Sequence, residues 1–216
     1  MLKSRKHVFW EAMVMTIAIF LVGLFLGMMI EQSNSNKISS FLIESEISLA
    51  DGNAFSEIIK NQNFSCDIIK NMNIEFADKV YEEAKLLEQF DGSEKLTDNL
   101  KSLHKKYDLL RTLLWTSNQE SLERCKNYNL IIYLYEYETE ELDKKAQQNV
   151  WSKIISDLHN NEESVLLIPI AADSELSSLN LLLSEYDIKS YPVVIINNKN
   201  VLYEIESEES LKKYLD

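Results

Sequence analysis

The sequence has little glycine and little proline. Its 216 residues include four glycines and two prolines, Pro169 and Pro192, and only Gly52 and Gly92 lie beyond residue 30. This scarcity argues against a loop-rich or disordered chain, and it favours long helices joined by short turns.

The usual motifs of enzyme sites are also missing. The chain has no phosphate-binding loop, no zinc-ligand spacing and no catalytic-triad signature. His104 and His159 are far apart in the pattern and lie on polar helix faces, so we expect solvated side chains and no metal or cofactor. Trp115 and Trp151 are expected to pack in the core or between modules and not to form a ligand cage.

Basic residues are few compared with acidic ones. The formal net charge is −13, and residues 31–216 are more acidic still, because Lys3, Arg5 and Lys6 precede them. Such a region repels phosphate backbones and anionic lipid surfaces, so nucleic acid is not an expected partner. A high negative charge also keeps a protein soluble, so the charge by itself does not indicate a function.

One long apolar run stands near the N-terminus. Residues 8–30 contain a single charge, Glu11. At ~1.5 Å per residue, a helix of this length crosses a ~30 Å hydrocarbon core. The run has no polar stripe, unlike a helix at the surface of a soluble protein, and no small-residue cleavage site follows it. We therefore predict an uncleaved, single-pass signal anchor in the lipid bilayer.

The flanking charges predict its orientation. Lys3, Arg5 and Lys6 precede the run, whereas Glu31 and only Lys37 closely follow it. The positive-inside bias then places residues 1–7 in the cytoplasm and residues 31–216 outside the cell membrane.

Two features of the anchor leave alternatives open. Glu11 is expected at the membrane interface, although type IV pilin-like proteins also carry a Glu after a basic leader; here His7 replaces the Gly expected before their processing site. Gly23 and Gly27 form a GxxxG pattern that lets two helices approach closely, which indicates a possible homodimer through the anchor.

Residues 31–126 are predicted to form a helical stalk. Residues 35–59 fit a helix with apolar positions at three-to-four spacing, although Gly52 weakens that prediction. The apolar stripe of this first helix is Ile43, Ile47, Ala50, Ala54 and Ile58. Two further helices are predicted on either side of a short break at residues 90–92, with Ser93 as the N-cap of the second. Their apolar stripes are Phe76, Val80, Tyr81, Ala84 and Leu87, and then Leu96, Leu100, Leu103, Tyr107, Leu110 and Leu114. The last two predict an antiparallel hairpin, with an intermolecular coiled coil as the alternative.

The two cysteines lie near the open end of this hairpin. Cys66 begins its first arm and Cys125 follows its second by ten residues. Outside the membrane the pair is expected to form a structural disulfide, which stabilises by ~4 kcal/mol on the chain-entropy model. A redox-active pair is the alternative, although no CxxC is present. Asn63 begins a glycosylation sequon beside Cys66.

Residues 127–216 alternate between strand and helix patterns. Thr139 is a predicted helix cap, Ser207 is another, and the asparagines of residues 197–200 suit a tight turn. The predicted strands are 130–135, 165–171, 191–196 and 201–205. The predicted helices are 139–158, with Leu142, Ala146, Val150, Ile154 and Leu158 on one side, then 177–186, with Leu179, Leu182 and Leu183, and finally 208–215. The order β-α-β-α-β-β-α indicates an α/β domain.

This order, together with the segment DIKSYPVVIINNKNVLYEI, resembles the second half of thioredoxin-like domains over residues 127–216. The resemblance implies a cis bond before Pro192. It also implies that Tyr191, Pro192, Tyr135 and Glu136 border a groove for an extended peptide.

The junction that carries CxxC in redox members of that superfamily departs from the pattern. Residues 135–140 read YEYETE, without a cysteine or serine substitute. The carboxylates from Glu136 to Glu141 suggest a solvated loop and a favourable helix start more than a cation site. Thioredoxin chemistry is therefore not expected here.

The segments FADKVYEEAKLLE and HKKYDLLRTLLW are similar to membrane-anchored archaeal proteins that join such a hairpin to a thioredoxin-like domain, which implies no activity. The sequence favours a noncatalytic interaction or scaffold protein with a protein or peptide partner. A thiol–disulfide oxidoreductase using Cys66 and Cys125, and a pilin-like assembly subunit, are the alternatives.

Overall fold

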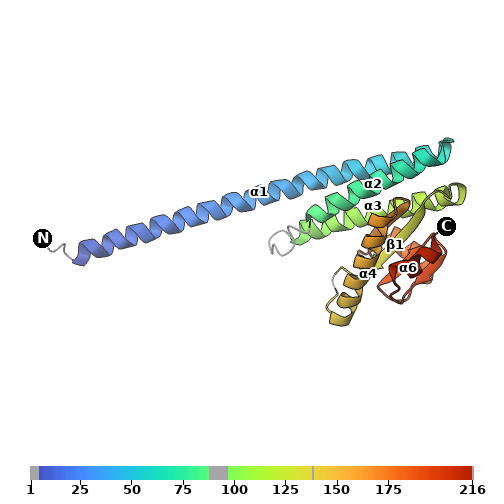
Figure 1. Ribbon diagram of the computed structural model, residues 1–216. Coiled ribbons are helices and arrows are strands. Elements are labelled where there is room, and N and C mark those ends of the chain that lie inside the picture. Colours follow the sequence, from blue (N-terminus) through green and yellow to red (C-terminus); the bar gives the residue numbers. More distant parts are fainter. Residues whose placement is uncertain (1–4, 88–96, 138, 216) are drawn as a thin grey trace. The chain divides into compact units, whose positions relative to one another are not determined.

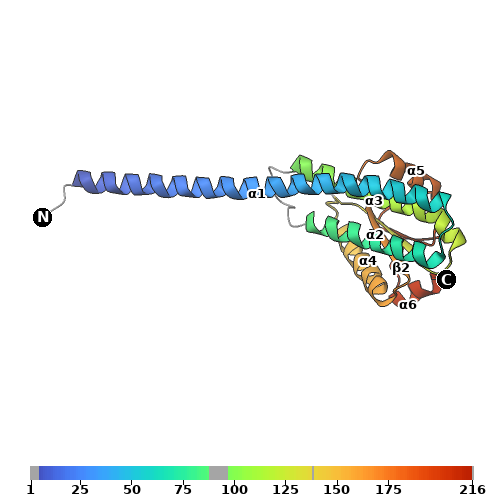
Figure 2. The ribbon, with the colours of Figure 1, turned by 90° about the horizontal axis from the view of Figure 1, so that it is seen from above.

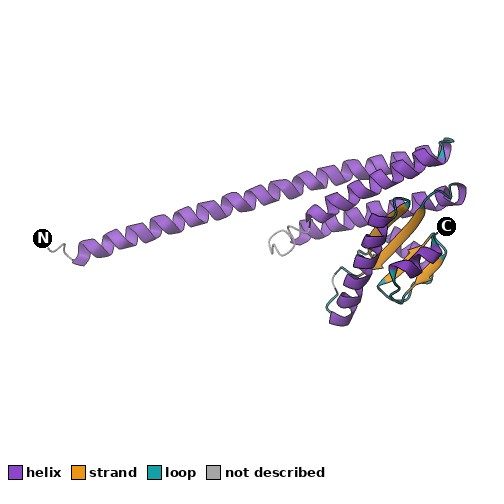
Figure 3. Cartoon of the chain, viewed as in Figure 1, coloured by secondary structure: helices purple, strands orange, loops and turns teal. Residues whose placement is uncertain are grey.

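A computed structural model describes residues 5–87, 97–137 and 139–215, with the side chains of 5, 6, 34 and 97–99 left aside. The chain is mostly helical, with one small mixed sheet (Figures 1 and 3). The elements are α1 (Arg5–Asn61), α2 (Cys66–Leu87), α3 (Thr97–Arg124), β1 (Asn129–Tyr135), α4 (Leu142–Asn161), β2 (Val165–Ala171), α5 (Ser177–Glu185), β3 (Val193–Ile196), β4 (Asn200–Leu202), α6 (Glu208–Leu211) and a 3₁₀ turn, η3 (Lys212–Tyr214).

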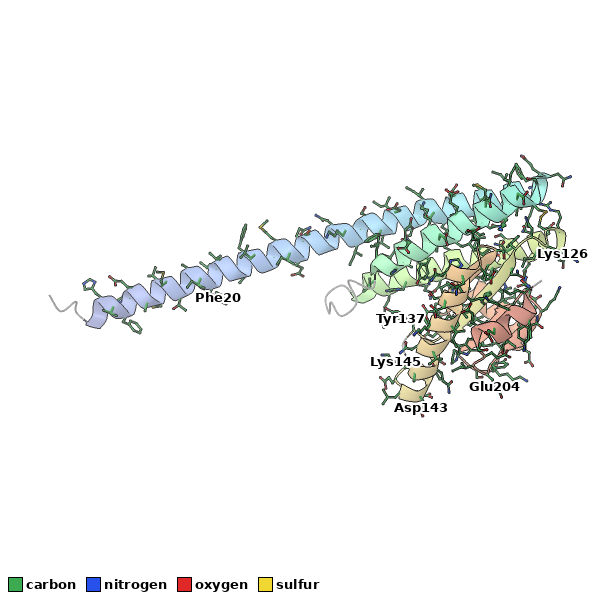
Figure 4. All side chains as sticks on the ribbon, in the orientation of Figure 1. Phe20, Lys126, Tyr137, Asp143, Lys145 and Glu204 are labelled. Atoms are coloured by element: carbon green, nitrogen blue, oxygen red, sulfur yellow. A yellow bond between two sulfur atoms is a disulfide. The ribbon has the colours of Figure 1, made fainter. Side chains whose placement is uncertain are left out.

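The chain divides into two compact units, residues 1–43 and 44–216. The first unit contains the beginning of α1, where the apolar side chains of residues 8–30 are exposed all round, as at Phe20 (Figure 4). This helix is long and apolar enough to cross a membrane. A Cβ added at Gly23 or Gly27 would meet nothing within 4 Å, so both positions are open. Lys3 lies outside the described residues.

In the second unit, α2 and α3 form the predicted antiparallel pair. The predicted α3 stripe from Leu100 to Leu114 is buried. The stripe predicted for α2 is partly wrong, because Tyr81 is 40% exposed and the buried face runs through Ile69, Asn73, Ala77, Val80, Ala84 and Leu87 instead. The predicted turn at 90–92, Ser93 and Leu96 lie outside the described residues.

Helix α3 is ten residues longer than its apolar stripe. It continues to Arg124 through buried polar residues, Ser117, Asn118 and Ser121. Asn118 Oδ1 accepts a hydrogen bond from the Tyr128 hydroxyl at 2.7 Å, which satisfies the buried amide. Cys125 therefore follows the helix directly.

The part of α1 in this unit is helical through Gly52, but it does not bury the predicted apolar stripe. Ile47 and Ile58 are 63% and 47% exposed, whereas Ser45, Ser48, Gly52 and Ser56 are buried. Small residues allow this helix to lie close to its neighbours. A Cβ at Gly52 would stand only 3.0 Å from Phe76 Cζ and 3.1 Å from Leu113 Cδ2.

The sheet has the strand order β2-β1-β3-β4. β1 and β2 are parallel and aligned from Asn129↔Val165 to Tyr135↔Ala171, whereas β3 is antiparallel to both β1 and β4. The prediction for β2 is confirmed. Two strands are shorter than predicted, because β3 begins at Val193 and β4 ends at Leu202.

One face of the sheet packs on α4 and α6. α3 contacts β1 and β2, and α5 packs against α3 (Figure 2). The hydrophobic core between the sheet, α4 and α6 contains Ile131, Tyr133, Trp151, Ile155, Leu158, Val165, Val194, Ile196 and Leu211. The predicted α4 face is partly wrong, because Leu158 is buried but Leu142 and Val150 are 81% and 45% exposed. The predicted cap is wrong too, since Glu141 and not Thr139 is the N-cap. The large Trp151 indole is fully buried in the core, so the face of α4 that carries Trp151 and Ile155 packs against the sheet.

Local predictions near the C-terminus are confirmed. Asn197 and Asn198 adopt left-handed φ angles of 52° and 55° in the turn between β3 and β4. Ser207 caps α6, where its side chain accepts a hydrogen bond from Ser210 N. The helix ends at Leu211 and continues as η3, so the predicted single helix 208–215 is shorter.

Candidate functional site

The loops that follow β1 and β2 meet at the carboxyl ends of these parallel strands. Ala172 N donates to Tyr135 O at 2.7 Å, which continues the β1–β2 pairing. Tyr137 N donates to Asp173 Oδ1 at 2.9 Å. The two loops are therefore joined by both backbone and side-chain hydrogen bonds, and ligands of α/β sheets commonly bind at this end of the strands.

Glu136 is fixed to α4. The Gln148 side chain bonds its backbone twice, by accepting from Glu136 N and by donating to Glu136 O, each at 3.0 Å. Lys144 Nζ lies 2.9 Å from Glu136 Oε2. The junction where redox members carry CxxC is thus held by the two hydrogen bonds of the Gln148 amide and by the Glu136–Lys144 ion pair. Glu138 lies outside the described residues.

The Tyr191–Pro192 bond is cis, as the resemblance implies. Pro192 is buried and Tyr191 is half-buried. The pKa of the Tyr191 phenol is raised, first by burial and then by the negative charges of Glu136 and Asp173. Of the four predicted groove residues, Tyr191 and Pro192 are adjacent in the chain, and the charge of Glu136 acts on the Tyr191 phenol.

Tyr135, the fourth of these residues, interacts elsewhere. Its ring stacks on Tyr133, with centroids 5.5 Å apart. Burial raises the pKa of the Tyr135 phenol, although the nearby Arg111 guanidinium, which hydrogen-bonds the side chain, opposes the shift. Tyr135 therefore links β1 to α3.

A cavity of about 340 Å³ opens between α3 and these two loops. His104 lies on its wall and packs at a tilt against Tyr137, with ring centroids 4.7 Å apart and Nε2 3.2 Å from the Tyr137 hydroxyl. His104 is therefore more than a solvated surface residue. His159 lies outside this wall and is also engaged, with Nδ1 2.8 Å from Val165 O. Among the described residues no cluster of potential metal ligands is found.

Asp108 is the most buried charged residue of the cavity wall, with an exposed fraction of 3%. Its Oδ1 accepts from Ala171 N at 3.1 Å and from Arg111 at 3.3 Å. Burial raises the pKa of the Asp108 carboxyl, and Arg111 opposes that shift. Asp108 was not predicted from the sequence, although the Asp–Arg pair at i, i+3 within an apolar stretch is typical of a buried ion pair.

The two cysteines lie far from this cavity. Cys66 and Cys125 form the predicted disulfide, with a Cα–Cα distance of 5.3 Å, and Cys125 is 1% exposed. The rise of α3 separates Cys125 from Asp108 by roughly 25 Å. Figure 4 shows the same separation, because Tyr137 of the cavity wall and Lys126, which follows Cys125, lie near opposite ends of α3. Asn63 of the sequon is exposed.

Comparisons with known proteins assign no family. No protein-family model, no curated protein and no solved structure matches the chain. The function is therefore inferred from the geometry of the chain's own residues.

Proposed function

We propose that the protein is a membrane-tethered, redox-inactive interaction module with a thioredoxin-like domain at residues 127–216. In this proposal α1 anchors the chain, and residues 31–216 act outside the cytoplasm as a scaffold. The groove beside Tyr191, Pro192 and Glu136 binds an extended segment of a protein partner.

The thioredoxin-like assignment is supported by topology and by one peptide bond. The elements follow the order β-α-β-α-β-β-α, and β1 pairs in parallel with β2 and antiparallel with β3. The cis bond at Pro192 stands directly before β3. In relatives with this arrangement, the same face binds substrate strands.

The single observation that carries the noncatalytic part is the clamped β1–α4 junction. It contains no cysteine, and Gln148 fixes the backbone of Glu136 through two hydrogen bonds. A thiol at this position would gain reactivity from the start of α4. Here an ion pair between Glu136 and Lys144 occupies the position.

The membrane orientation rests on the charges that flank α1. Three basic residues precede the apolar run, and acidic residues dominate after it. The disulfide between Cys66 and Cys125 agrees with this orientation, because such bonds persist in oxidising compartments.

Peptide selection tests the binding proposal. The full chain in lipid nanodiscs is panned against a display library of random ten-residue peptides. Selected peptides are then titrated by fluorescence anisotropy. We expect them to bind the Tyr191→Ala variant about tenfold more weakly, because a half-buried aromatic side chain is a typical binding hot spot. Tyr81→Ala is the matched control, since Tyr81 is an exposed tyrosine on α2.

Two results contradict this proposal. One is a selection in which no peptide binds above the empty-nanodisc background. The other is equal affinity for the wild type and the Tyr191→Ala variant. Backbone N-methylation of a selected peptide adds a further check, because recognition of an extended segment depends on main-chain hydrogen bonds.

A further inference from the structure

The sequon Asn63-Phe64-Ser65 has no part in the proposed binding function. It is the only Asn-x-Ser/Thr triplet of the sequence, and it lies on the C-terminal side of the apolar run. The structure places it in the loop between α1 and α2, because α1 ends at Asn61 and α2 begins at Cys66 (Figure 3). Surface loops of this kind are where N-linked oligosaccharides are attached.

Exposure alternates along this loop. Asn63 and Ser65 are exposed, whereas Phe64 between them and Cys66 after them are half-buried. In an extended chain the side chains of residues i and i+2 point to the same side, whereas in a helix they stand about 200° apart. The alternation therefore indicates that the Asn63 amide and the Ser65 hydroxyl share the solvent side of the loop.

The side-chain amide of Asn63 is not used by the fold. Asn61, two positions earlier, donates its Nδ2 to Glu57 O at 2.9 Å. In the described part of the chain, Asn63 makes no comparable side-chain hydrogen bond and no ion pair. The Nδ2 atom of Asn63 is therefore available for a new bond.

Ser65 begins α2 as its N-cap, and this role leaves its hydroxyl accessible. Ile69 N donates to the Ser65 carbonyl at 3.1 Å, and Ile68 N donates to the hydroxyl at 3.5 Å. The second distance exceeds the usual N–H···O range, so this bond is weak. The disulfide of Cys66 fixes the residue that follows. The sequon therefore has a defined place at the surface.

We propose that Asn63 is the acceptor of an N-linked oligosaccharide. In this step Asn63 Nδ2 forms a bond to the anomeric carbon of an oligosaccharide carried on a lipid phosphate. The bond between that carbon and the phosphate oxygen breaks, and the lipid phosphate leaves with the electron pair. A base of the transferring membrane enzyme takes one proton from Nδ2, and nothing is oxidised or reduced. The inference rests on the proposed placement of residues 31–216 outside the cytoplasm.

The test is cell-free translation of the full chain into endoplasmic-reticulum microsomes, followed by gel electrophoresis with and without peptide-N-glycosidase. We expect a larger species that the glycosidase removes. Asn63→Gln and Ser65→Ala are expected to abolish it, whereas Ser65→Thr keeps the hydroxyl and is expected to retain it. Asn61→Gln is the matched control, since Asn61 is also exposed but has no hydroxyl two positions later. An unshifted wild type, or a shift that persists in Asn63→Gln, overturns the proposal.

A second sequon separates failure of this inference from failure of the membrane orientation. In the Asn63→Gln chain, Glu162→Thr places a hydroxyl two positions after Asn160, which is exposed on α4. The change removes only a surface ion pair with Lys212, which contributes little to stability. A shift in this chain with none in the wild type overturns the Asn63 inference and leaves the orientation standing. Absence of both shifts contradicts the orientation and this inference together.

Discussion

Helices α1 and α3 both carry apolar residues at heptad-like spacing in residues 44–216, and they use them differently. In α3, Leu103, Tyr107 and Leu110 are fully buried. In α1, Ile47 and Ile58 are exposed, and a face of serines and Gly52 is buried instead. The same sequence pattern thus marks a packed seam in one helix and a solvent-facing stripe in the other.

The difference teaches that the shape of the partner decides which face is buried. α2 packs on α3 through large side chains such as Tyr107, whose hydroxyl donates to Glu83 of α2. Where α1 meets α2 and α3, Phe76 and Leu113 project towards it, and a Cβ at Gly52 would stand only 3.0 and 3.1 Å from them. The predicted weak point of α1, Gly52, is therefore a position of close packing.

The largest expected effect on this comparison comes from the disulfide that joins the ends of α2 and α3. The double variant Cys66→Ser/Cys125→Ser is expected to lose about 4 kcal/mol of unfolding free energy, because a loop of this length is no longer closed in the unfolded chain. Urea titration of the full chain, followed by tryptophan fluorescence, measures the loss. A change below about 1 kcal/mol would contradict a stabilising role.

A pair of truncations compares the two stripes directly. Leu103→Ala is expected to cost about 3 kcal/mol, because it leaves a cavity at a fully buried position. Ile47→Ala is expected to change the unfolding free energy by less than about 0.5 kcal/mol, since Ile47 is 63% exposed. Similar losses in the same urea titrations would show that the α1 stripe is buried in solution, for example against a second copy.

The close approach at Gly52 gives a third comparison. Gly52→Leu is expected to cost about 2 kcal/mol through overpacking against Phe76 and Leu113. Ala54→Leu, on the exposed face of α1, is the matched control and is expected to be close to neutral. If Gly52→Leu stabilises the protein, α1 does not pack here as described.

The smallest expected effect is a pH dependence. Burial of Glu83, which accepts a hydrogen bond from Tyr107, raises the pKa of its carboxyl above the usual 4.5. The folded state therefore holds this proton more tightly, and the stability contribution of Glu83 grows as the pH falls from 7 towards 4.5. Glu83→Gln is expected to remove that growth, which thermal unfolding midpoints between pH 4 and 7 will reveal.

Glu208 provides the control of opposite sign. Hydrogen bonds from Asn161 and Lys212 lower the pKa of its carboxyl. Its stabilising contribution is present above pH 4.5 and is lost as the pH falls through the lowered pKa. Glu208→Gln is therefore expected to reduce the acid sensitivity of the protein, and equal pH slopes in the two variants would contradict both assignments.

Whether a segment is a helix or a strand was predictable from the sequence where its residues favoured one of the two. β2 was predicted with its observed bounds because its seven apolar and β-branched residues suit only a buried strand. The buried face of α4 was not predictable, because two apolar faces compete and only the sheet selects Trp151 and Ile155. The end of α3 was missed because its last turns are buried through Asn118 and Ser121, and such polar burial depends on distant partners.

The candidate site was predictable only where a local motif or a resemblance pointed to its residues. Tyr191, Pro192 and Glu136 followed from a local motif and a resemblance. Asp108 and Asp173 come from α3 and from the loop after β2, and the bond from Ala171 N to Asp108 spans 63 residues. No local pattern encodes that proximity, since it arises when α3 packs against the edge strand.

The central proposal is that residues 127–216 form a thioredoxin-like domain that acts by binding and not by thiol chemistry. The most direct measurement is an insulin-reduction assay on the full chain in nanodiscs, with dithiothreitol as the reductant. We predict the rate of reductant alone for the wild type and for the Cys66→Ser/Cys125→Ser variant. Thiol-dependent turnover by the wild type that disappears in the double variant would contradict the proposal and would identify the protein as an oxidoreductase.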